Sequence, residues 1–436
     1  MRVTLTRAQP LRGRVAVPPD KSISHRALIL GALSSGLHIE NLSPSDDVKA
    51  TLRCVEALGA EITREEDGSI VVRAGRPRAE RAGVMDAGNS GTTARLLAGL
   101  CAVRGGACTI TGDASLRRRP MARVADPLRR MGARVETTEE GTLPMTVAGG
   151  TLQGIEYALP VPSAQVKSAV LIAGLCAAGE TRVIEPVPTR DHTERMLEAL
   201  GEPVARERAG AGASVGVRGV PASEAPRLGA GNVRVPGDFS SAAFFIVAAA
   251  CIPGSEVRLE GVGVNPTRTG LLTIMREMGA SIAIENAREI DGEPVADLVV
   301  SATPLRGVAV SDPELIAAAI DEIPVLAVAA VHAEGETVLR GAGELRHKES
   351  DRIAVMAANL RALGAAVEER EDGLAIAGGA RLRGALVTAA GDHRVAMAMA
   401  VAALIANGET AIDDAGVVGV SYPSFFDDLR ALARAA

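Results

Sequence analysis

The stretch "EALGAEI" (residues 56–62) carries the pattern that decides the fold of this chain. Its first half closes an amphipathic helix, a glycine follows, and alternating apolar residues then begin a strand. Glycine is favoured just after a helix, because it tolerates the left-handed conformation that ends the last turn. We therefore expect a helix, a glycine cap and a strand in direct succession.

The same pattern returns four more times along the chain, at intervals of about 70 to 85 residues. The copies are "RRMGARV" (129–135), "EALGEPV" (198–204), "REMGASI" (276–282) and "RALGAAV" (361–367). The chain stops about one period after the last copy, where a sixth unit would end. The spacing predicts one structural unit repeated six times.

A second pattern recurs in phase with the first. Glycine turns followed by alternating strands, such as "GGACTITGD" and "NGETAIDDA", occur six times, and each follows an apolar helix. These helices carry almost no polar face, which predicts burial on all sides. We expect an α/β fold of six strand–helix–strand–helix units in two domains of three units each, with the apolar helices inside and the amphipathic helices outside.

Length and composition support two globular domains. At 436 residues the chain exceeds one ordinary hydrophobic core. Its net charge of −6 offers no general attraction to nucleic acid or to anionic membranes. Five phenylalanines, two tyrosines and no tryptophan leave few rings for stacking on bases. We therefore expect neither nucleic acid nor a membrane among its partners.

The N-terminal residues and the cysteines predict a cytoplasmic location. No apolar stretch of signal-peptide length opens the chain. The longest uncharged apolar run, residues 395–407, is too short to span a bilayer and predicts a buried helix. Five scattered cysteines show no metal-ligand spacing, and we expect reduced, mostly buried thiols. They are Cys54, Cys101, Cys108, Cys176 and Cys251.

Small polar segments precede all six apolar helices. They read "PPDKSISHR", "DAGNSGTT", "PVPSAQVKS", "VPGDFSS", "AAAIDEIP" and "AAGDHR". A helix N-terminus presents free amides and a partial positive charge, which suits phosphate or carboxylate. Capping accounts for any one segment, since Ser, Asp and Asn cap helices without a ligand. Six segments in phase, three of them with Lys or Arg in the first turn, favour anion binding.

Two cationic clusters accompany the first two of these helices. Ser22 and Arg26 are i, i+4 neighbours on one helix face, with Lys21 just ahead, so they can hold one anion together. His25 in the same stretch stays unassigned. "GDASLRRRPM" (112–121) places three arginines after the glycine-rich "GNSGTTARL", which predicts a second anion site. A solvated basic loop is the alternative.

Charged residues also gather in the second half of the chain. "LRHKESDRI" (345–353) sets Lys348, Glu349 and Arg352 along an expected helical start, although an exposed salt-bridged helix has the same pattern. Arg394 stands at the mouth of the most apolar helix. Asp321 opens another apolar helix, where it can cap the helix or, facing a cationic site, act as a base.

The sequence contains no fingerprint for a metal or a nucleotide. We find no GxxxxGK[ST], no HExxH and no GxGxxG that opens a βαβ unit. Many cations and few carboxylates are expected to face a common centre. The pattern predicts small substrates with several negative charges between them, and neither a metal nor a cofactor.

Eight motifs in order resemble the 5-enolpyruvylshikimate-3-phosphate (EPSP) synthase family, from the first anion segment to the last twenty residues. They are "PPDKSISHRALIL", "GNSGTTARLL", "GDASLRRRPM", "PSAQVKSAVLIAGL", "TRDHTERML", "LRHKESDRI", "GDHRVAMA" and "SYPSFFDDL". "SAQVKSA" and "TRDHTE" are similar to the class II bacterial branch. The resemblance implies two similar domains of three βαβαββ units, residues 20–233 and residues 1–19 with 234–436. It also implies an active site in the cleft between them.

The family resemblance also implies an activity. These enzymes transfer the enolpyruvyl group of phosphoenolpyruvate to the 5-hydroxyl of shikimate 3-phosphate and release phosphate through a tetrahedral intermediate. The reaction belongs to the shikimate pathway, which leads to chorismate and the aromatic amino acids, and glyphosate inhibits it. Two phosphates and two carboxylates enter such a site, which agrees with the cationic clusters described above.

The resemblance assigns site residues position by position. Shikimate 3-phosphate would contact Lys21, Ser22, Arg26, Ser163, Ala164, Gln165, Arg190, Asp321 and Lys348. Phosphoenolpyruvate would contact Lys21, Gly91, Arg119, Gln165, Arg352 and Arg394. Asp321 would accept the 5-hydroxyl proton, and Glu349 or Lys21 would protonate the methylene carbon.

Two positions depart from the family pattern. Val420 and Ser421 stand near the end motif, where one branch has a lysine, and Glu344 stands where some members have asparagine. Each departure concerns a secondary ligand and leaves the expected reaction unchanged.

Two other functions compete with this interpretation. The sister enzyme that acts on UDP-N-acetylglucosamine usually carries a reactive cysteine in the loop matching "GDASLRRRP", and this loop has none. A non-catalytic anion-binding scaffold would be expected to lose a carboxylate or a cationic clamp. Asp321, Glu349, Arg119 and Arg394 are all present. Without a heptad or an exposed apolar stripe, we expect a monomer.

Overall fold

The computed structural model divides into two compact units. It describes residues 1–75, 83–104, 106–210, 212–220 and 227–434. Unit 1 comprises Met1–Pro18, Pro236–Arg288 and Pro294–Ala436. Unit 2 comprises Pro19–Val235 and Glu289–Glu293.

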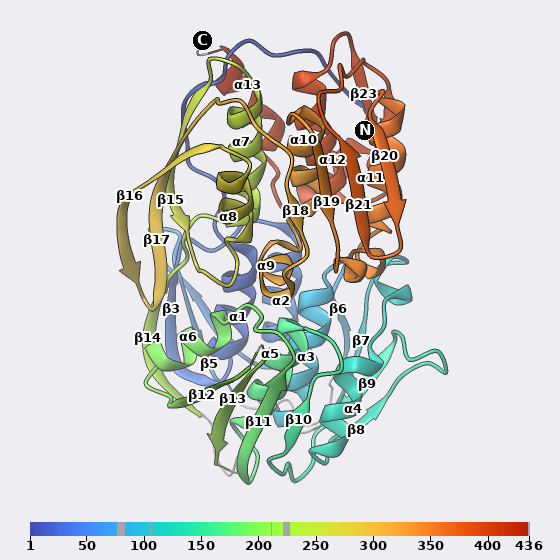
Figure 1. Cartoon of the computed structure of the whole chain (residues 1–436). Coiled ribbons are helices and arrows are strands. Elements are labelled where there is room, and N and C mark those ends of the chain that lie inside the picture. Colours follow the sequence, from blue (N-terminus) through green and yellow to red (C-terminus); the bar gives the residue numbers. More distant parts are fainter. Residues whose placement is uncertain (76–82, 105, 211, 221–226, 435–436) are drawn as a thin grey trace. The chain divides into compact units, whose positions relative to one another are not determined.

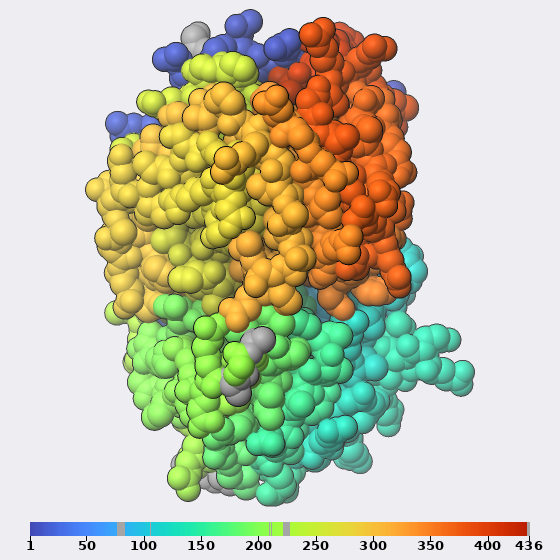
Figure 2. Space-filling view, viewed as in Figure 1, coloured from blue at the N-terminus to red at the C-terminus, as the bar shows by residue number. Residues whose placement is uncertain are grey.

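The N-terminal segment belongs to unit 1. Strand β1 (Val3–Leu5) pairs antiparallel with β23 (Thr410–Asp413), and β2 (Arg12–Val15) runs parallel to β15 (Glu256–Gly263). Figure 1 accordingly places the N-terminus beside β23, and in Figure 2 the blue N-terminal residues lie against yellow-green and red-orange residues of the same unit. The first residues therefore complete two sheets whose other strands come from the second half of the chain.

Three sheets form the outside of unit 2. In spatial order they are β14 (Leu228–Arg234), β3 (Ser34–Glu40), β5 (Ile70–Arg73) and β4 (Glu61–Arg64); β6 (Val84–Asp86), β7 (Ala107–Thr111), β9 (Met145–Ala148) and β8 (Arg134–Glu136); and β10 (Glu156–Ala158), β11 (Gly179–Glu185), β13 (Gly212–Gly219) and β12 (Val204–Ala209).

Unit 1 repeats the arrangement. Its sheets are β16 (Ser281–Ile290), β17 (Glu293–Ser301), β15 and β2; β18 (Ala309–Val310), β19 (Glu336–Leu339), β21 (Gly373–Ala377) and β20 (Ala366–Arg370); and β1, β23 and β22 (Leu386–Thr388). Each of the six sheets in the described chain has one parallel pair next to an antiparallel one, for example β6–β7 beside β7–β9. The six-fold repeat expected from the sequence is confirmed.

The apolar helices lie inside each unit, as predicted. They are α1 (Lys21–Gly31), α3 (Gly91–Arg104) and α5 (Ala164–Gly174) in unit 2, and α7 (Phe239–Cys251), α10 (Ile323–His332) and α12 (His393–Ile405) in unit 1. Every residue of α7 is buried. In unit 2, α3 and α5 pack closely because Gly99 has no side chain, and a Cβ there would collide with the carbonyl oxygen of Ala169.

The amphipathic helices end as their sequences predict. They are α2 (Asp46–Ala57), α4 (Ala122–Arg130), α6 (His192–Ala199), α8 (Gly270–Glu277), α11 (Arg352–Ala362) and α13 (Phe425–Arg434). The glycine after each of the first five has a positive φ: Gly59 93°, Gly132 105°, Gly201 79°, Gly279 97° and Gly364 96°. Residues that carry a side chain rarely adopt this backbone conformation, so glycine is required where the chain turns from helix to strand.

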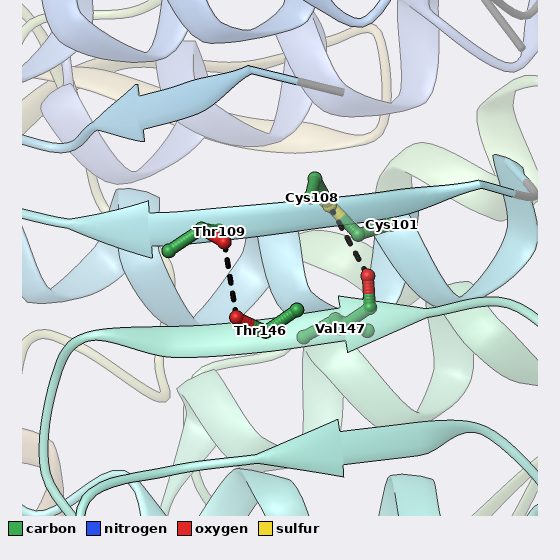
Figure 3. The surroundings of a disulfide bond; sticks show 5 residues. All are labelled: Cys101, Cys108, Thr109, Thr146 and Val147. Carbon is green, nitrogen blue, oxygen red and sulfur yellow. Dashed lines mark hydrogen bonds between the residues drawn. A yellow bond between two sulfur atoms is a disulfide. The ribbon is translucent and has the colours of Figure 1, made fainter. Parts of the chain in front are cut away.

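The cysteines depart from expectation at one pair. Cys101, on α3, and Cys108, on β7, form a disulfide beside the ladder of β7 and β9 (Figure 3), so the expectation of reduced thiols is wrong for these two. Cys108 follows Cys101 by seven positions. Cys54, Cys176 and Cys251 are free and buried. Burial raises the pKa of Cys54 and of Cys251 to about 12, which keeps both thiols protonated.

Within the described residues, no single helix has both the length and the apolar character needed to cross a membrane. Among the residues that the structure describes, one bent pair, α9 (Pro313–Ala319) with α10, meets both criteria when taken together, and its axes differ by 103° at the break.

Candidate active site

The mouth of α1 brings together the first cationic cluster. Asp20 caps the helix by accepting from the backbone N–H of Ile23 at 2.9 Å. The Nζ of Lys21 lies 2.9 Å from Oδ2 of Asp47, and both side chains are largely shielded from solvent. Asp47 was not foreseen, because it reaches Lys21 from α2, 26 residues further along the chain.

Arg26 is buried within unit 2 and holds three segments together. Its Nε donates to Oγ1 of Thr193 at 2.8 Å, and its Nη2 donates to Oγ of Ser168 at 2.9 Å. Its Nη1 donates to the carbonyl oxygen of Ser22 at 2.9 Å, so the expected i, i+4 neighbours do meet. The guanidinium thus links α1 to α5 and to the first turn of α6, and nothing in the sequence indicated these long-range partners.

A second cluster surrounds the start of α3. Arg119 is buried, and its Nη2 donates to Oδ1 of Asn89 at 2.8 Å. A Cβ on Gly91 would lie 3.4 Å from Nη1 of Arg119 and 2.8 Å from Nη1 of Arg95. Arg95 in turn donates to Oε1 of Gln165 at 2.7 Å. The structure therefore brings three expected phosphoenolpyruvate ligands into one neighbourhood within unit 2.

Arg95 was missed in the sequence, although a signal was present. It stands four residues after Gly91 on α3, so it shares a helix face with that glycine. Gln165 completes the contact by donating from Nε2 to Oγ1 of Thr92 at 2.9 Å. Arg95 therefore acts as a brace between α3 and the start of α5.

The remaining unit 2 candidates lie at helix starts. Ser163 is the N-cap of α5, and its hydroxyl accepts from the N–H of Val166 at 3.3 Å, while Ala164 is the first helical residue. Arg190 is half-buried in the segment between β11 and α6. Ser163 is occupied as a cap, but its hydroxyl hydrogen can still donate to a ligand.

His25, left unassigned from the sequence, lies on α1 and is fully buried. Its Nδ1 lies 2.7 Å from Oγ1 of Thr51, which contacts Oγ1 of Thr93 at 2.7 Å. Burial, and then the charges of Lys21 and Arg26, hold the pKa of His25 well below its usual value. The imidazole is therefore neutral at neutral pH and packs as a polar core group.

Unit 1 carries a cluster in which carboxylates surround one arginine, Arg352. This side chain is 1% exposed and donates from Nε to Asp392 at 2.7 Å, from Nη1 to Asp321 at 3.2 Å and from Nη2 to Glu349 at 2.6 Å. Burial alone would lower the pKa of Arg352, but these carboxylates outweigh it and raise the pKa. Arg352 is thus permanently charged and orients three acids at once.

Two further cations converge on Asp321. The Nζ of Lys348 lies 3.7 Å from Oδ1 of Asp321, and Nη2 of Arg394 lies 3.7 Å from Oδ2. Arg394 also donates from Nη1 to the carbonyl oxygen of Asp321 at 3.1 Å. The carboxylate of Asp321 is therefore held in place by three cationic side chains from separate elements.

The helical start expected around Lys348 is wrong. A 3-10 helix covers Gly343–His347, Lys348 is extended with φ −87° and ψ −153°, and α11 begins only at Arg352. Asp351 sets this boundary, because its side chain caps the helix by accepting from the N–H of Ala354 at 3.0 Å. Lys348 and Arg352 are therefore not helical neighbours, and they meet through Asp321 instead.

Asp392 is the residue that the sequence analysis overlooked in this cluster. It lies in the quoted "GDHR" motif, is fully buried and caps α12 by accepting from the N–H of Arg394 at 2.9 Å. The same carboxylate accepts from Nε of Arg352. One capping aspartate thus fixes the two arginines expected to contact phosphoenolpyruvate.

Comparisons with known proteins agree with this architecture. Two solved structures share its enolpyruvyl transferase fold. EPSP synthase from Acinetobacter baumannii has a TM-score of 0.83 and 41% identity, with 99% of this chain and 98% of that chain covered. The enolpyruvyl transferase NikO from Streptomyces tendae has a TM-score of 0.77 over 98% and 96% of the two chains, at 19% identity.

The sequence comparisons narrow the class to one family. The model of EPSP synthase (3-phosphoshikimate 1-carboxyvinyltransferase) matches residues 5–429. A 3-phosphoshikimate 1-carboxyvinyltransferase from Gloeobacter violaceus is 54% identical, with 98% of each chain covered, and one from Synechococcus sp. is 51% identical, with 99% of each covered. The chain belongs to the EPSP synthase family.

Proposed function

We propose that this chain transfers the enolpyruvyl group of phosphoenolpyruvate to the 5-hydroxyl of shikimate 3-phosphate and releases phosphate. The observation that carries the proposal is the match to the EPSP synthase model over residues 5–429. The charge inventory supports it, since two phosphates and two carboxylates need several buried cations. This activity forms the precursor of chorismate in the shikimate pathway.

The roles of the individual residues are part of the proposal. Shikimate 3-phosphate contacts Lys21, Ser22, Arg26, Ser163, Ala164, Gln165, Arg190, Asp321 and Lys348. Phosphoenolpyruvate contacts Lys21, Gly91, Arg119, Gln165, Arg352 and Arg394. Residues of both units therefore serve the same pair of substrates.

The proposed reaction has two steps. The 5-hydroxyl oxygen bonds to C2 of phosphoenolpyruvate and gives its proton to Asp321, while the methylene carbon gains a proton from Glu349 or Lys21. In the second step the group that protonated the methylene carbon takes a proton back from the new methyl group, the carbon–carbon double bond re-forms, the bond from C2 to the phosphate oxygen breaks, and inorganic phosphate leaves. Because Arg352 and Lys348 lie beside Asp321, they hold its carboxylate ready as the base.

A phosphate-release assay tests the activity directly. Purified protein is incubated with phosphoenolpyruvate and either shikimate 3-phosphate or UDP-N-acetylglucosamine, and the product is identified by mass spectrometry. We expect phosphate release with shikimate 3-phosphate only. Release with the sugar nucleotide would favour the sister transferase, and no release with either would favour a non-catalytic scaffold.

We further propose a cytoplasmic monomer that requires no cofactor and is inhibited by glyphosate. The absence of a heptad or an exposed apolar stripe in the sequence supports the monomer. Light scattering behind a sizing column measures the mass in solution, and a dimer would contradict the proposal. Activity that survives a chelator and dialysis would agree with the absence of a metal cofactor.

A further inference from the structure

A buried charge cluster in unit 2 lies outside the residues assigned to substrates. It consists of Lys167 on α5, Glu185 at the end of β11 and Glu194 on α6, and no side chain of the three is more than 2% exposed. The Nζ of Lys167 lies 2.9 Å from Oε2 of Glu185 and 2.7 Å from Oε1 of Glu194. Because buried charges are costly unless paired, the three groups depend on one another.

The cluster fixes the backbone just before Arg190. Lys167 donates from Nζ to the carbonyl oxygen of Thr189 at 3.3 Å, and the N–H of Thr189 donates to Oε1 of Glu185 at 3.2 Å. The hydroxyl of Thr189 donates to the same carboxylate oxygen. The N–H, the carbonyl and the side chain of Thr189 are therefore all held, which limits where Arg190 can lie.

A second set of contacts lies beside the first, one residue later on α5 and one residue earlier on α6. Ser168 follows Lys167 on α5, Thr193 precedes Glu194 on α6, and their hydroxyl groups are 2.7 Å apart. Arg26 donates to both. The junction thus joins α1, α5 and the start of α6. Residues that we assign to shikimate 3-phosphate begin α1 and α5, and Arg190 lies two residues before α6.

We propose that Lys167 is a positioning residue for the shikimate 3-phosphate subsite, holding Arg190 and the mouths of α1 and α5 in one arrangement through Glu185 and Glu194. The inference rests on the proposed function, because it concerns the substrate of that site. Lys167 itself touches no substrate.

Electrostatics explain why an apolar residue would not serve in its place. Burial alone lowers the pKa of Lys167, but Glu194 and Glu185 outweigh it and raise the pKa, so the ammonium stays charged. Without that ammonium, two buried carboxylates would face each other, and burial already raises the pKa of Glu185. The pair would protonate or move apart, and in either case Thr189 would lose its restraints.

The test compares Lys167→Met, Lys167→Arg and a control, Arg227→Met, with the wild-type protein. The control removes a cation at the other end of α5, where Arg227 donates to the carbonyl oxygen of Leu175 at 2.8 Å and pairs with Glu202 at 2.6 Å. Unfolding by denaturant gives the stability of each variant. Titration calorimetry gives its affinity for shikimate 3-phosphate, and steady-state kinetics give KM for each substrate.

We expect Lys167→Met to bind shikimate 3-phosphate about tenfold to a hundredfold more weakly, with a smaller change in KM for phosphoenolpyruvate, since misplaced ligand-binding groups have effects of this order. Lys167→Arg keeps the charge and should recover most of the affinity. Arg227→Met should lose stability without losing affinity.

If Lys167→Met does not fold, Glu194→Gln and Glu185→Gln carry the test, each with an expected loss of about threefold or more in affinity. A folded Lys167→Met with wild-type affinity overturns the inference, and so does an equal loss in Arg227→Met. In the absence of a folded Lys167→Met, wild-type affinity in both glutamine variants overturns it. If the wild-type protein itself does not bind shikimate 3-phosphate, the proposed function fails instead.

Discussion

The arginines that we assign to the substrates have different kinds of partner in the two units. Within unit 2, Arg26 donates to two hydroxyl groups and a backbone carbonyl, and Arg119 donates to an amide and a hydroxyl. Within unit 1, Arg352 contacts three carboxylates, and Arg394 lies 3.7 Å from Asp321 and 3.5 Å from Glu322. The same side chain is thus placed by neutral oxygens in one unit and by acids in the other.

Under the proposed function, the difference separates two tasks within one reaction. Hydroxyl and amide oxygens orient a guanidinium without cancelling its charge, which leaves the charge to act on a phosphate or carboxylate. Acid partners cancel much of the charge, but they place carboxylates where protons must move. Unit 2 is therefore suited to holding anions and unit 1 to combining anion contacts with proton transfer, although Lys21 with Asp47 is an acid pair within unit 2.

The largest effect is expected from removing the base in unit 1. Asp321→Asn keeps the shape and much of the hydrogen bonding with Arg352 but cannot accept a proton. We expect turnover to fall about a hundredfold to ten-thousandfold, the usual contribution of a general base. Steady-state kinetics measure the fall, and calorimetry with shikimate 3-phosphate should show nearly unchanged binding. Wild-type turnover would remove Asp321 from the role of base.

A smaller effect is expected from changing the geometry of a cation in unit 2. Arg119→Lys keeps the charge but replaces a planar fork with a point charge, which cannot clamp an anion with two parallel bonds. We expect kcat/KM for phosphoenolpyruvate to fall about tenfold to a hundredfold, the range of one or two charged hydrogen bonds. The same parameter for shikimate 3-phosphate should change much less. Equal falls would move Arg119 out of the phosphoenolpyruvate subsite.

A methyl group added at the start of α3 should have a smaller effect on the phosphoenolpyruvate subsite than Arg119→Lys. In Gly91→Ala the new Cβ would lie 2.8 Å from Nη1 of Arg95, so the end of that side chain must shift and loosen its hold on Gln165. Overpacking of this kind costs about 1 to 2 kcal/mol, so KM for phosphoenolpyruvate should rise about tenfold. Ala94→Gly on the same helix is a control for the added or lost methyl group, and an unchanged KM in Gly91→Ala would contradict the proposed contact.

Much of the fold could be predicted because its signals are local. Each signal lies within one short segment: a glycine follows an amphipathic helix, or an apolar run forms an inner helix. Because these signals recur along the chain, the interpretation did not depend on any single copy. The positive φ of Gly59 and the fully buried α7 follow directly from such stretches. The disulfide between Cys101 and Cys108 could not be predicted in this way, because it depends on how α3 turns back onto β7.

Less of the candidate site could be predicted, because its partners are distant in the chain. Arg26 reaches Thr193 across 167 residues, and Arg352 reaches Asp392 across 40. Motifs indicated which side chains were present at each helix N-terminus, but not which oxygen atom would accept a hydrogen bond from each guanidinium. Asp392 was visible as a capping residue in "GDHR", yet only the structure shows that it also orients Arg352.

The smallest expected effect concerns pH and compares the fully buried His25 of unit 2 with the half-buried His332 of unit 1. Burial, Lys21 and Arg26 lower the pKa of His25, whereas burial alone lowers the pKa of His332 in unit 1. In the unfolded chain histidine takes up a proton near pH 6.5. In the folded chain each of these two histidines takes up a proton only at a lower pH. The stability from each neutral histidine is therefore complete above pH 6.5 and is lost as the pH falls below it.

Between pH 7.5 and pH 6 the unfolded chain takes up a proton on His25 that the folded chain disfavours, which should cost up to about 0.8 kcal/mol of stability. His25→Gln, which cannot be protonated, should remove this part of the pH dependence from unit 2. Hydrogen exchange of amides in α1 and α3, against those in α7 and α10, measures the two units separately. His332→Gln is the counterpart and should flatten the pH dependence in unit 1 alone. If His25→Gln leaves the pH dependence of unit 2 unchanged, the folded unit does not keep the buried imidazole neutral, and the proposed difference between the two units is weakened.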